Sequence, residues 1–218
     1  MNPPAACLFD LDGLLLDTEP LHAHAWREAA AHFGHTLAAE QLLRLRGRRR
    51  FDCARQVLGW MAQDVGAVPS LEELLAVRQP IAEALLVQAP PMPGAPELVA
   101  RCRRKAVPMA LATSSSREAV ALKAAPHPWL ELIEVRVHGD DPELVDGKPA
   151  PDPFLLAARR LGVAPDGCWA FEDSVAGVAA ALAAGCRVHV LLPPGVGCEA
   201  YPDGVNCLRS LEEVRLEP

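Results

Sequence analysis

The sequence has 218 residues, of which half are hydrophobic and 22% are charged, so it is neither a disordered nor a fibrous chain. Lys and Arg number 21 against 28 Asp and Glu, and the resulting net charge of −7 argues against a general nucleic-acid binder. No apolar run approaches the roughly 20 residues that a membrane helix needs, and the N-terminus lacks the pattern of a signal peptide. We therefore expect a cytoplasmic monomer or weak dimer that binds neither nucleic acid nor membranes.

The N-terminal part of the chain predicts one short strand followed by a long helical segment. Ala5–Asp10 is an apolar run that ends at an acid, as is typical of a buried strand. Thr18–Phe33 has the pattern of a helix, and Ala38–Val87 contains further helical patterns with no convincing strand between them. The proline-rich stretch Ala89–Gly94 cannot continue a helix, so we predict a stiff connector there.

After this connector, predicted strands and helices alternate. The helices are predicted at Ala95–Lys105, Arg117–Ala124, Asp152–Leu161 and Val175–Ala184. The strands are predicted at Pro108–Thr113, Val135–Gly139, Cys168–Asp173 and Arg187–Leu192. Such alternation implies a parallel sheet that is covered on both faces. We therefore expect an α/β fold with a Rossmann-like core formed by residues 1–16 and 89–218, into which residues 17–88 are inserted as an α-helical domain. The segment after Pro193 carries no functional signal.

The cysteines do not indicate a disulfide framework or a zinc site. They are Cys7, Cys53, Cys102, Cys168, Cys186, Cys198 and Cys207. Their number is odd, their spacing is irregular and no C-x-x-C pair occurs, so we expect reduced thiols that mostly pack as small apolar residues. His22 and His24 form an H-x-H sequence, but on a helix these two side chains point to different faces.

Polar residues follow several predicted strands at their carboxyl ends, which is where open parallel sheets bind ligands. These residues, with one lysine in a nearby loop, are Asp10, Asp12, Thr113, Ser114, Ser115, Lys148, Glu172 and Asp173. Taken singly, each has an ordinary structural explanation, because D-x-D-G is often a turn and Ser, Thr and Asp often cap helices. The presence of all these residues at one edge of the predicted sheet indicates a functional site rather than separate turns and caps.

Four carboxylates at one rim repel one another, since two unit charges ~4 Å apart cost about 4 kcal/mol at an effective dielectric constant of 20. A divalent cation together with Lys148 would offset three of the four charges. Oxygen ligands of this kind suit Mg²⁺, which keeps several waters and binds substrate phosphate. We therefore predict a magnesium site.

The same residues suit phosphoryl transfer. A carboxylate such as Asp10 can attack phosphorus and form an aspartyl-phosphate. The charge that develops on the phosphoryl oxygens then needs a cation, Lys148, and the hydroxyl and amide donors of Thr113 and the residues after it. Asp12, two residues beyond the nucleophile, is placed for general acid–base catalysis.

Four segments together resemble the haloacid dehalogenase superfamily, in the branch with a helical cap inserted after the first motif. They are DLDGLLLDTE (10–19), ALATSS (110–115), GKPAPDPF (147–154) and FEDSVAGVAAALAAG (171–185). The resemblance implies that Asp10 is the nucleophile and a metal ligand, and that Asp12 is the acid–base and binds Mg²⁺ through its carbonyl. It also implies that Thr113 binds phosphate, that Lys148 stabilises charge, and that Glu172 and Asp173 serve the metal.

Within this branch, GDDPE at Gly139–Glu143, with Lys123 and His127 upstream, is similar to phosphatases acting on pseudouridine 5′-phosphate, glycerol phosphate or FMN. The cap should determine the choice of substrate. We expect Ser114, Ser115, His22 and Arg50 to bind the substrate. Arg50 ends a basic run that begins at Arg44 and that could hold a second phosphate. The alternative for this run is a solvated helix end.

The leading hypothesis is a magnesium-dependent phosphatase of a small phosphorylated metabolite, such as a sugar or nucleoside phosphate. β-Phosphoglucomutases share the four motifs, so a phosphomutase is the alternative within the same class. From a different class, a phospho-acceptor receiver domain combines similar residues but is shorter and has no helical insertion. A catalytically silent binding protein is the remaining alternative, although none of the expected functional residues is missing.

Overall fold

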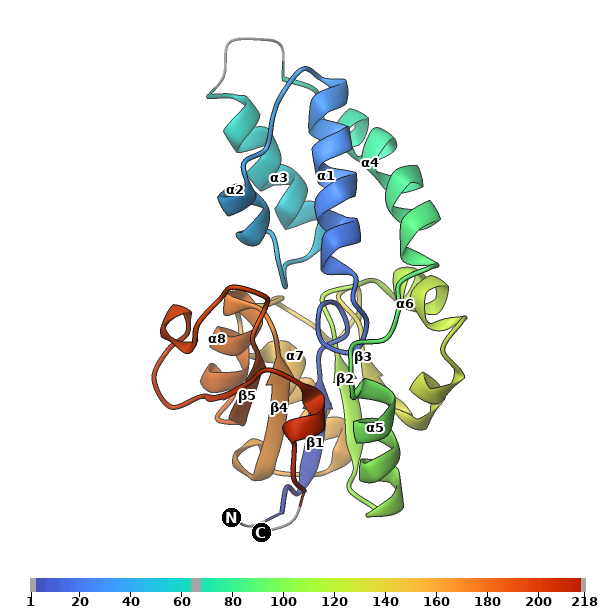
Figure 1. The fold of residues 1–218 in the computed structure, drawn as a ribbon, viewed down its shortest axis with the longest axis vertical. Helices are drawn as coiled ribbons and strands as arrows, with labels where there is room; N and C mark the ends of the chain where they lie inside the picture. Colours follow the sequence, from blue (N-terminus) through green and yellow to red (C-terminus); the bar gives the residue numbers. More distant parts are fainter. Residues whose placement is uncertain (1–2, 64–67, 217–218) are drawn as a thin grey trace.

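The computed structural model describes residues 3–63 and 68–216, and Figure 1 shows a helical part lying over one edge of a sheet-containing part. The helices of the upper part are α1 (Glu19–His32), α2 (Ala39–Leu43), α3 (Arg50–Met61) and α4 (Leu71–Leu86). They follow the first strand directly in the sequence, as the sequence predicts. We refer to residues 17–88 as the cap and to the remainder as the core, and these domain boundaries stay a prediction.

The core contains one sheet of six parallel strands in the order β3-β2-β1-β4-β5-β6. The strands are β1 (Ala6–Phe9), β2 (Met109–Ala112), β3 (Val135–Val137), β4 (Cys168–Glu172), β5 (Arg187–Leu191) and β6 (Asn206–Leu208). The helices of the core are α5 (Ala95–Arg104), α6 (Arg117–Ala124), α7 (Asp152–Leu161) and α8 (Val175–Ala183). The predicted α/β class with a Rossmann-like parallel sheet is thus confirmed.

Both faces of the sheet are buried, which explains why its strands are continuous apolar runs. Side chains alternate along β1, so that Cys7 and Phe9 join one apolar cluster while Ala6 and Leu8 join the other. The first cluster includes Leu98 of α5, and the second includes residues of α7 and α8. Because β1 pairs with β2 on one side and β4 on the other, it delivers the residues after Phe9 to the middle of the sheet edge.

The cap has an apolar cluster of its own, which contains Trp26, Val57 and Leu74 from α1, α3 and α4. A capping box begins α4: Ser70 Oγ accepts a hydrogen bond from the Glu73 amide at 3.2 Å, and Glu73 Oε2 accepts one from the Ser70 amide at 2.7 Å. The two contacts satisfy amides that the first helical turn leaves unpaired. None of the helices in the described ranges is long and apolar enough to cross a membrane.

The structure corrects the sequence prediction in the segment after β5. Strand β6 was not predicted, because it has three residues and follows an irregular stretch rich in Pro and Gly. The expectation of reduced cysteines is wrong for Cys198 and Cys207, which form a disulfide with their Cα atoms 6.0 Å apart. The chain turns back between β5 and β6 and brings these two residues together, which their spacing in the sequence does not indicate. The other five cysteines are free and buried, as predicted.

Candidate active site

Three carboxylates meet at the carboxyl edge of the sheet, beyond the central strands. Asp10 follows β1, while Glu172 and Asp173 stand at the end of β4. The Asp10 amide donates to the Phe171 carbonyl at 3.0 Å, so the pairing of β1 with β4 continues into the site. All three residues are buried, and one carboxylate oxygen from each lies within 4.8 Å of the others. The structure therefore brings together Asp10, Glu172 and Asp173 from their separate motifs.

Lys148 provides a positive charge inside this cluster. Its side chain is buried, and its Nζ donates to Asp10 Oδ1 and to Glu172 Oε1. Burial raises the pKa of Asp10 to about 7, against the opposing effect of Lys148 and with a further increase from Glu172. Burial opposes the charge of Lys148 as well, but Asp10 and Glu172 together hold its pKa above the ordinary value. Lys148 thus remains a cation, but its single positive charge is smaller than the summed negative charge of the three carboxylates.

Asp173 is held in place by both the core and the cap. Arg46 of the cap donates from Nη2 to Asp173 Oδ2 at 2.6 Å and pairs through Nε with Glu19 Oε2 at 3.1 Å. Gly13 approaches Asp173 so closely that a Cβ there would overlap Asp173 Oδ2, and its φ of +82° also favours glycine. Burial raises the pKa of Asp173 well above its usual range, although Arg46 opposes this. Burial likewise raises the pKa of Glu19 to about 7.

These observations fit a divalent cation. Asp173 Oδ1 is buried and has no hydrogen-bond partner among the described residues, which is unusual for a buried polar atom. Burial raises the pKa of Asp10 and of Asp173, because Lys148 and Arg46 offset only part of the desolvation of these acids. Carboxylate oxygens are the donors that Mg²⁺ prefers. Asp10, Glu172 and Asp173 therefore match the donor set of such a cation.

The Asp12 carboxylate is not part of this cluster and accepts hydrogen bonds from a separate group of side chains. Lys123 Nζ donates to both Asp12 carboxylate oxygens at 2.6 Å, and the hydroxyls of Thr18 and Ser115 donate to Oδ1 and Oδ2 at 2.8 Å. Burial opposes the charge of Asp12, but Lys123 and His22 hold the pKa of this carboxyl well below its usual range. The Asp12 side chain is therefore an ionised carboxylate here, separate from the three convergent acids.

The contacts of His22 determine its tautomer. Arg78 of α4 places its Nη2 2.8 Å from His22 Nδ1, and because a guanidinium only donates, Nδ1 is the acceptor. The hydrogen on Nε2 is then directed at Asp12 Oδ1, 3.3 Å away. Burial lowers the pKa of His22, which favours the neutral ring that this arrangement needs. Arg78 and His22 of the cap thus orient a carboxylate of the core.

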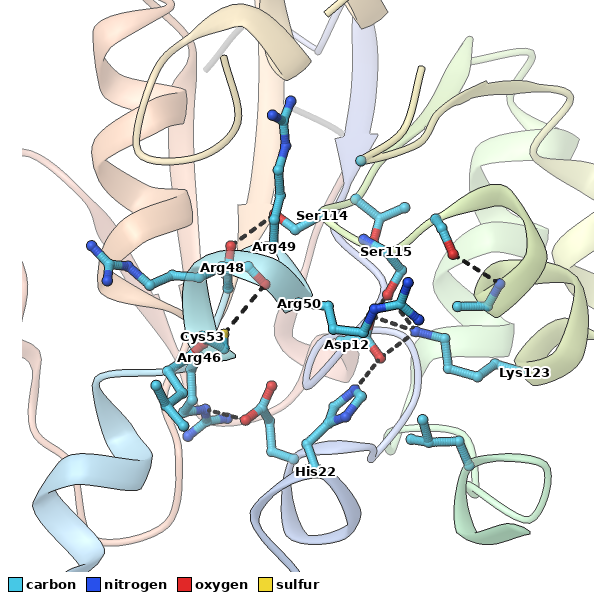
Figure 2. Close-up of a pocket in the computed structure, with 18 of the residues that line it drawn as sticks. Asp12, His22, Arg46, Arg48, Arg49, Arg50, Cys53, Ser114, Ser115 and Lys123 are labelled. Carbon is cyan, nitrogen blue, oxygen red and sulfur yellow. Dashed lines mark hydrogen bonds and ion pairs between the residues drawn. The ribbon is translucent and has the colours of Figure 1, made fainter. Parts of the chain in front are cut away.

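A cavity of about 570 Å³ lies between cap and core, within the size range of small-molecule sites. Asp10, Asp12 and Thr113 line its core side, and Arg50 lines its cap side. Arg50 donates from Nη1 to Gln79 Oε1 of α4 at 2.9 Å, so its guanidinium is held by the cap, and in Figure 2 Arg48 and Arg49 extend in other directions. The basic run is therefore neither one site nor one solvated face, because its arginines diverge.

Thr113, Ser114 and Ser115, three of the four hydroxyl residues after β2, have different partners. Thr113 is buried, and its Oγ1 accepts a hydrogen bond from the Ser115 amide at 3.1 Å. The Ser115 hydroxyl is directed to Asp12, as described above. The Ser114 hydroxyl donates to the Gly47 carbonyl of the cap at 2.8 Å (Figure 2). Ser114 therefore contacts the cap rather than the acidic cluster in this structure.

Several residues of the site were not predicted individually. Lys123, Arg78, Glu19 and Arg46 were not assigned to these contacts, yet each contacts Asp12, His22 or Asp173 directly or through one neighbour. The sequence prediction names Lys123 only beside the GDDPE segment and Arg46 only within the basic run. For Lys123 and Arg78, the available signal was a cation within an apolar stretch of a helix, VALKAA and LLAVRQPIA.

Comparisons with known proteins agree with this geometry. A family model described as haloacid dehalogenase-like hydrolase matches residues 4–185. The chain belongs to this family. It is 38% identical to a probable pseudouridine-5′-phosphatase from Drosophila melanogaster, over 97% of this chain and 91% of the relative. It is 35% identical to the fructose-1-phosphate phosphatase YqaB from Escherichia coli (strain K12), over 83% of this chain and 93% of the relative.

The fold is also similar to that of solved structures in this family. A mutant of CbbY from Rhodobacter sphaeroides, in complex with xylulose-(1,5)bisphosphate, matches with a TM-score of 0.79 and 27% identity over 96% of both chains. Membership of the haloacid dehalogenase-like hydrolases confirms the resemblance that the four motifs indicate, since all four lie within the matched residues. The roles of individual side chains stay predictions.

Proposed function

We propose that this protein is a magnesium-dependent phosphatase that hydrolyses a small phosphomonoester through an aspartyl-phosphate on Asp10. The observation that carries this proposal is the gathering of Asp10, Glu172 and Asp173 around Lys148, next to a cavity of about 570 Å³. Two relatives at 35% identity or more are named as phosphatases of small metabolites, pseudouridine 5′-phosphate and fructose 1-phosphate, which supports the same substrate class here.

The carboxylates of Asp10, Glu172 and Asp173, with the Asp12 carbonyl, are the proposed ligands of Mg²⁺. When bound, the cation would neutralise charge on these acids and on the substrate phosphate. Lys148 would hold Asp10 and Glu172 in position through the hydrogen bonds that it already makes to both. Thr113 and the amides after it would donate to the phosphoryl oxygens at the end of β2.

Asp10 would attack phosphorus, and the bond from phosphorus to the leaving oxygen would break. The leaving oxygen takes a proton from Asp12, which then removes a proton from the water that attacks the aspartyl-phosphate. In this structure Asp12 is ionised, which matches its role as base. A phosphate dianion beside Asp12 raises the pKa of its carboxyl, so the acid role belongs to the substrate complex.

The cap is proposed to provide substrate recognition. His22, Arg50, Ser114 and Ser115 all line the cavity, and Gln79 of the cap holds the Arg50 guanidinium there. A guanidinium in this position suits an anionic or hydroxyl-rich group on the far end of a substrate. We therefore favour a sugar or nucleoside phosphate over a larger or apolar ester.

The first test is phosphate release from a panel of phosphorylated metabolites with Mg²⁺, compared between the wild type and Asp10→Asn. We expect turnover in the wild type and a loss of at least roughly 10³-fold in the variant, because an amide does not replace the nucleophile. Asp52→Asn, which changes a half-buried acid on α3 that pairs with Arg55, should retain full activity. Turnover that persists in Asp10→Asn would refute the assignment of the nucleophile.

A phosphomutase is the second candidate, favoured by the bisphosphate in the CbbY complex and by the presence of Arg50 in the lining of the cavity. β-Glucose 1-phosphate separates the two activities, since a mutase forms glucose 6-phosphate and a phosphatase releases free phosphate. A stable phosphoprotein without turnover would instead indicate a receiver. The absence of both phosphorylation and turnover would indicate a silent binding protein.

A further inference from the structure

The irregular segment between β5 and β6 reaches back to the acidic cluster. Tyr201, in this segment, donates a hydrogen bond from its hydroxyl to the Asp173 carbonyl at 2.6 Å. Its ring packs against the apolar cluster that contains Val188 and Val190 of β5, so the side chain is anchored at its base and polar at its tip. The hydroxyl therefore contacts the main chain of a residue whose carboxylate belongs to the cluster.

Tyr201 makes the third of three hydrogen bonds that hold Asp173 in position. The Asp173 amide donates to Glu172 Oε2 at 3.1 Å, the side chain accepts from Arg46, and the carbonyl accepts from Tyr201. Under these three contacts, Asp173 Oδ1 is buried and has no hydrogen-bond partner within residues 3–63 and 68–216. The direction of this oxygen thus depends on contacts outside the cluster, one of which is Tyr201. Outer contacts of this kind orient ligands and tune metal affinity.

The Cys198–Cys207 disulfide closes the segment that carries Tyr201. The two cysteines are nine positions apart and flank Tyr201, and closure of a loop restricts the conformations of the residues within it. Cys198 is exposed, whereas all five free cysteines are buried. Because all seven cysteines lie within the described residues, this disulfide is the cysteine pair that a reagent in solvent meets first.

We propose that Tyr201 is a positioning residue for Asp173 and that the Cys198–Cys207 disulfide is a reversible modification site that holds Tyr201 in place. The inference rests on the metal centre of the proposed function. In the modification step, a dithiol reductant exchanges with the disulfide. The S–S bond of the protein breaks to two thiols, and the two thiols of the reductant form its own disulfide, so two electrons and two protons pass to the protein.

The first experiment measures the Kd for Mg²⁺ by titration calorimetry on the oxidised protein. Tyr201→Phe should raise the Kd about tenfold, the lower end of the effect of outer contacts on metal sites. Asn206→Ala is the matched control, because Asn206 lies on β6 at the end of this segment, where its side chain donates to the Val188 carbonyl and does not contact Asp173. A lower melting temperature with an unchanged Kd in Tyr201→Phe would show a structural role alone and overturn the proposal.

The second experiment repeats the titration after treatment with dithiothreitol. Alkylation with iodoacetamide and mass spectrometry should locate the new thiols at Cys198 and Cys207 only. Reduction should raise the Kd of the wild type toward that of Tyr201→Phe and should change the Kd of Tyr201→Phe by less than about twofold, since the contact is already lost. Equal Mg²⁺ affinity of the oxidised and reduced wild type would overturn the disulfide as a modification site.

The two proposals fail in different ways. A redox-sensitive Kd in a protein that releases no phosphate from any ester would refute the phosphatase and support this inference. Phosphate release with a Kd that neither Tyr201→Phe nor reduction changes would support the phosphatase and overturn this inference. A protein that binds no Mg²⁺ at all would refute the metal centre and this inference together.

Discussion

At the scale of single residues, Lys123 and Asp12 form an ion pair with little access to solvent. Lys123 is 1% exposed, and its ammonium donates to both oxygens of Asp12 and to Ser115 Oγ. A buried charge costs several kcal/mol unless a partner compensates for it. Lys123 and Asp12 therefore depend on each other, and removal of one leaves the other unpaired.

We expect Lys123→Met to lower the free energy of unfolding by about 3 kcal/mol, because the variant keeps the shape of the side chain but leaves the Asp12 carboxylate without its counter-charge. The double variant Lys123→Met with Asp12→Asn removes both charges and should regain at least about 1 kcal/mol of this loss. Urea denaturation of the wild type, both single variants and the double variant measures the coupling. Losses that simply add in the double variant would contradict the dependence.

At the scale of elements, the first turn of α8 packs directly against Glu172. Ser174 caps this helix, with its Oγ accepting from the Gly177 amide at 3.0 Å, and the same hydroxyl donates to Glu172 Oε2 at 3.1 Å. A Cβ on Gly177 would overlap the carboxylate of Glu172. The absence of a side chain at Gly177 is thus what allows Glu172 to lie between Lys148 and the helix.

Gly177→Ala should therefore reduce kcat/KM by roughly 10²-fold, because a displacement of about 1 Å at a reacting site has effects of this size. Gly59→Ala is the matched control: Gly59 lies within α3, with no atom within 4 Å of the added methyl group. That variant should keep full activity and gain up to about 1 kcal/mol in stability from helix propensity. Activity assays and urea denaturation compare the two variants. Equal kcat/KM and equal stability in both would refute the close approach of Gly177 to Glu172.

At the scale of the whole molecule, the strand-end residues could be predicted because topology places them. Parallel strands share one carboxyl edge, so Asp10, Thr113 and Glu172 had to lie near one another once the alternation of strands and helices was recognised. The helical insertion was predictable for a similar reason, because Ala38–Val87 contains no strand pattern. Both inferences use periodicity and order along the chain, which a sequence contains.

Contacts made by long side chains from distant segments could not be predicted in this way. Lys123 is 111 positions from Asp12, and Arg46 is 127 positions from Asp173. These contacts depend on how the cap packs against the core and on how α6 packs within the core. Many surface arginines and lysines have the same local sequence pattern, so the pattern does not identify these two. The disulfide and strand β6 were missed for the same reason, since both depend on how an irregular segment folds back.

We expect a buried histidine in the sheet to contribute to a dependence of stability on pH. His189 of β5 lies with its ring centroid 4.7 Å from that of Trp169 and 4.9 Å from that of Phe171, and its Nε2 is buried with no partner among the described residues. Burial lowers the pKa of His189 to about 4, with Arg187 adding to the effect. The folded protein therefore holds this ring neutral at a pH at which the unfolded chain protonates it.

The sign of the resulting pH dependence follows from this difference. Between pH ~6.5 and ~4 the ring of His189 takes up a proton in the unfolded chain but not in the folded one, so the contribution of His189 to stability falls as pH falls, by up to about 3 kcal/mol over the interval. His189→Phe keeps an aromatic ring between the same neighbours and removes this contribution, so its loss of stability over the interval should be smaller by that amount. His24→Gln, which removes an exposed imidazole of α1, should follow the wild type.

The test is the free energy of unfolding in urea, measured at steps between pH 7 and 4. If the wild type and His189→Phe change in stability by the same amount over this interval, His189 is not the group responsible.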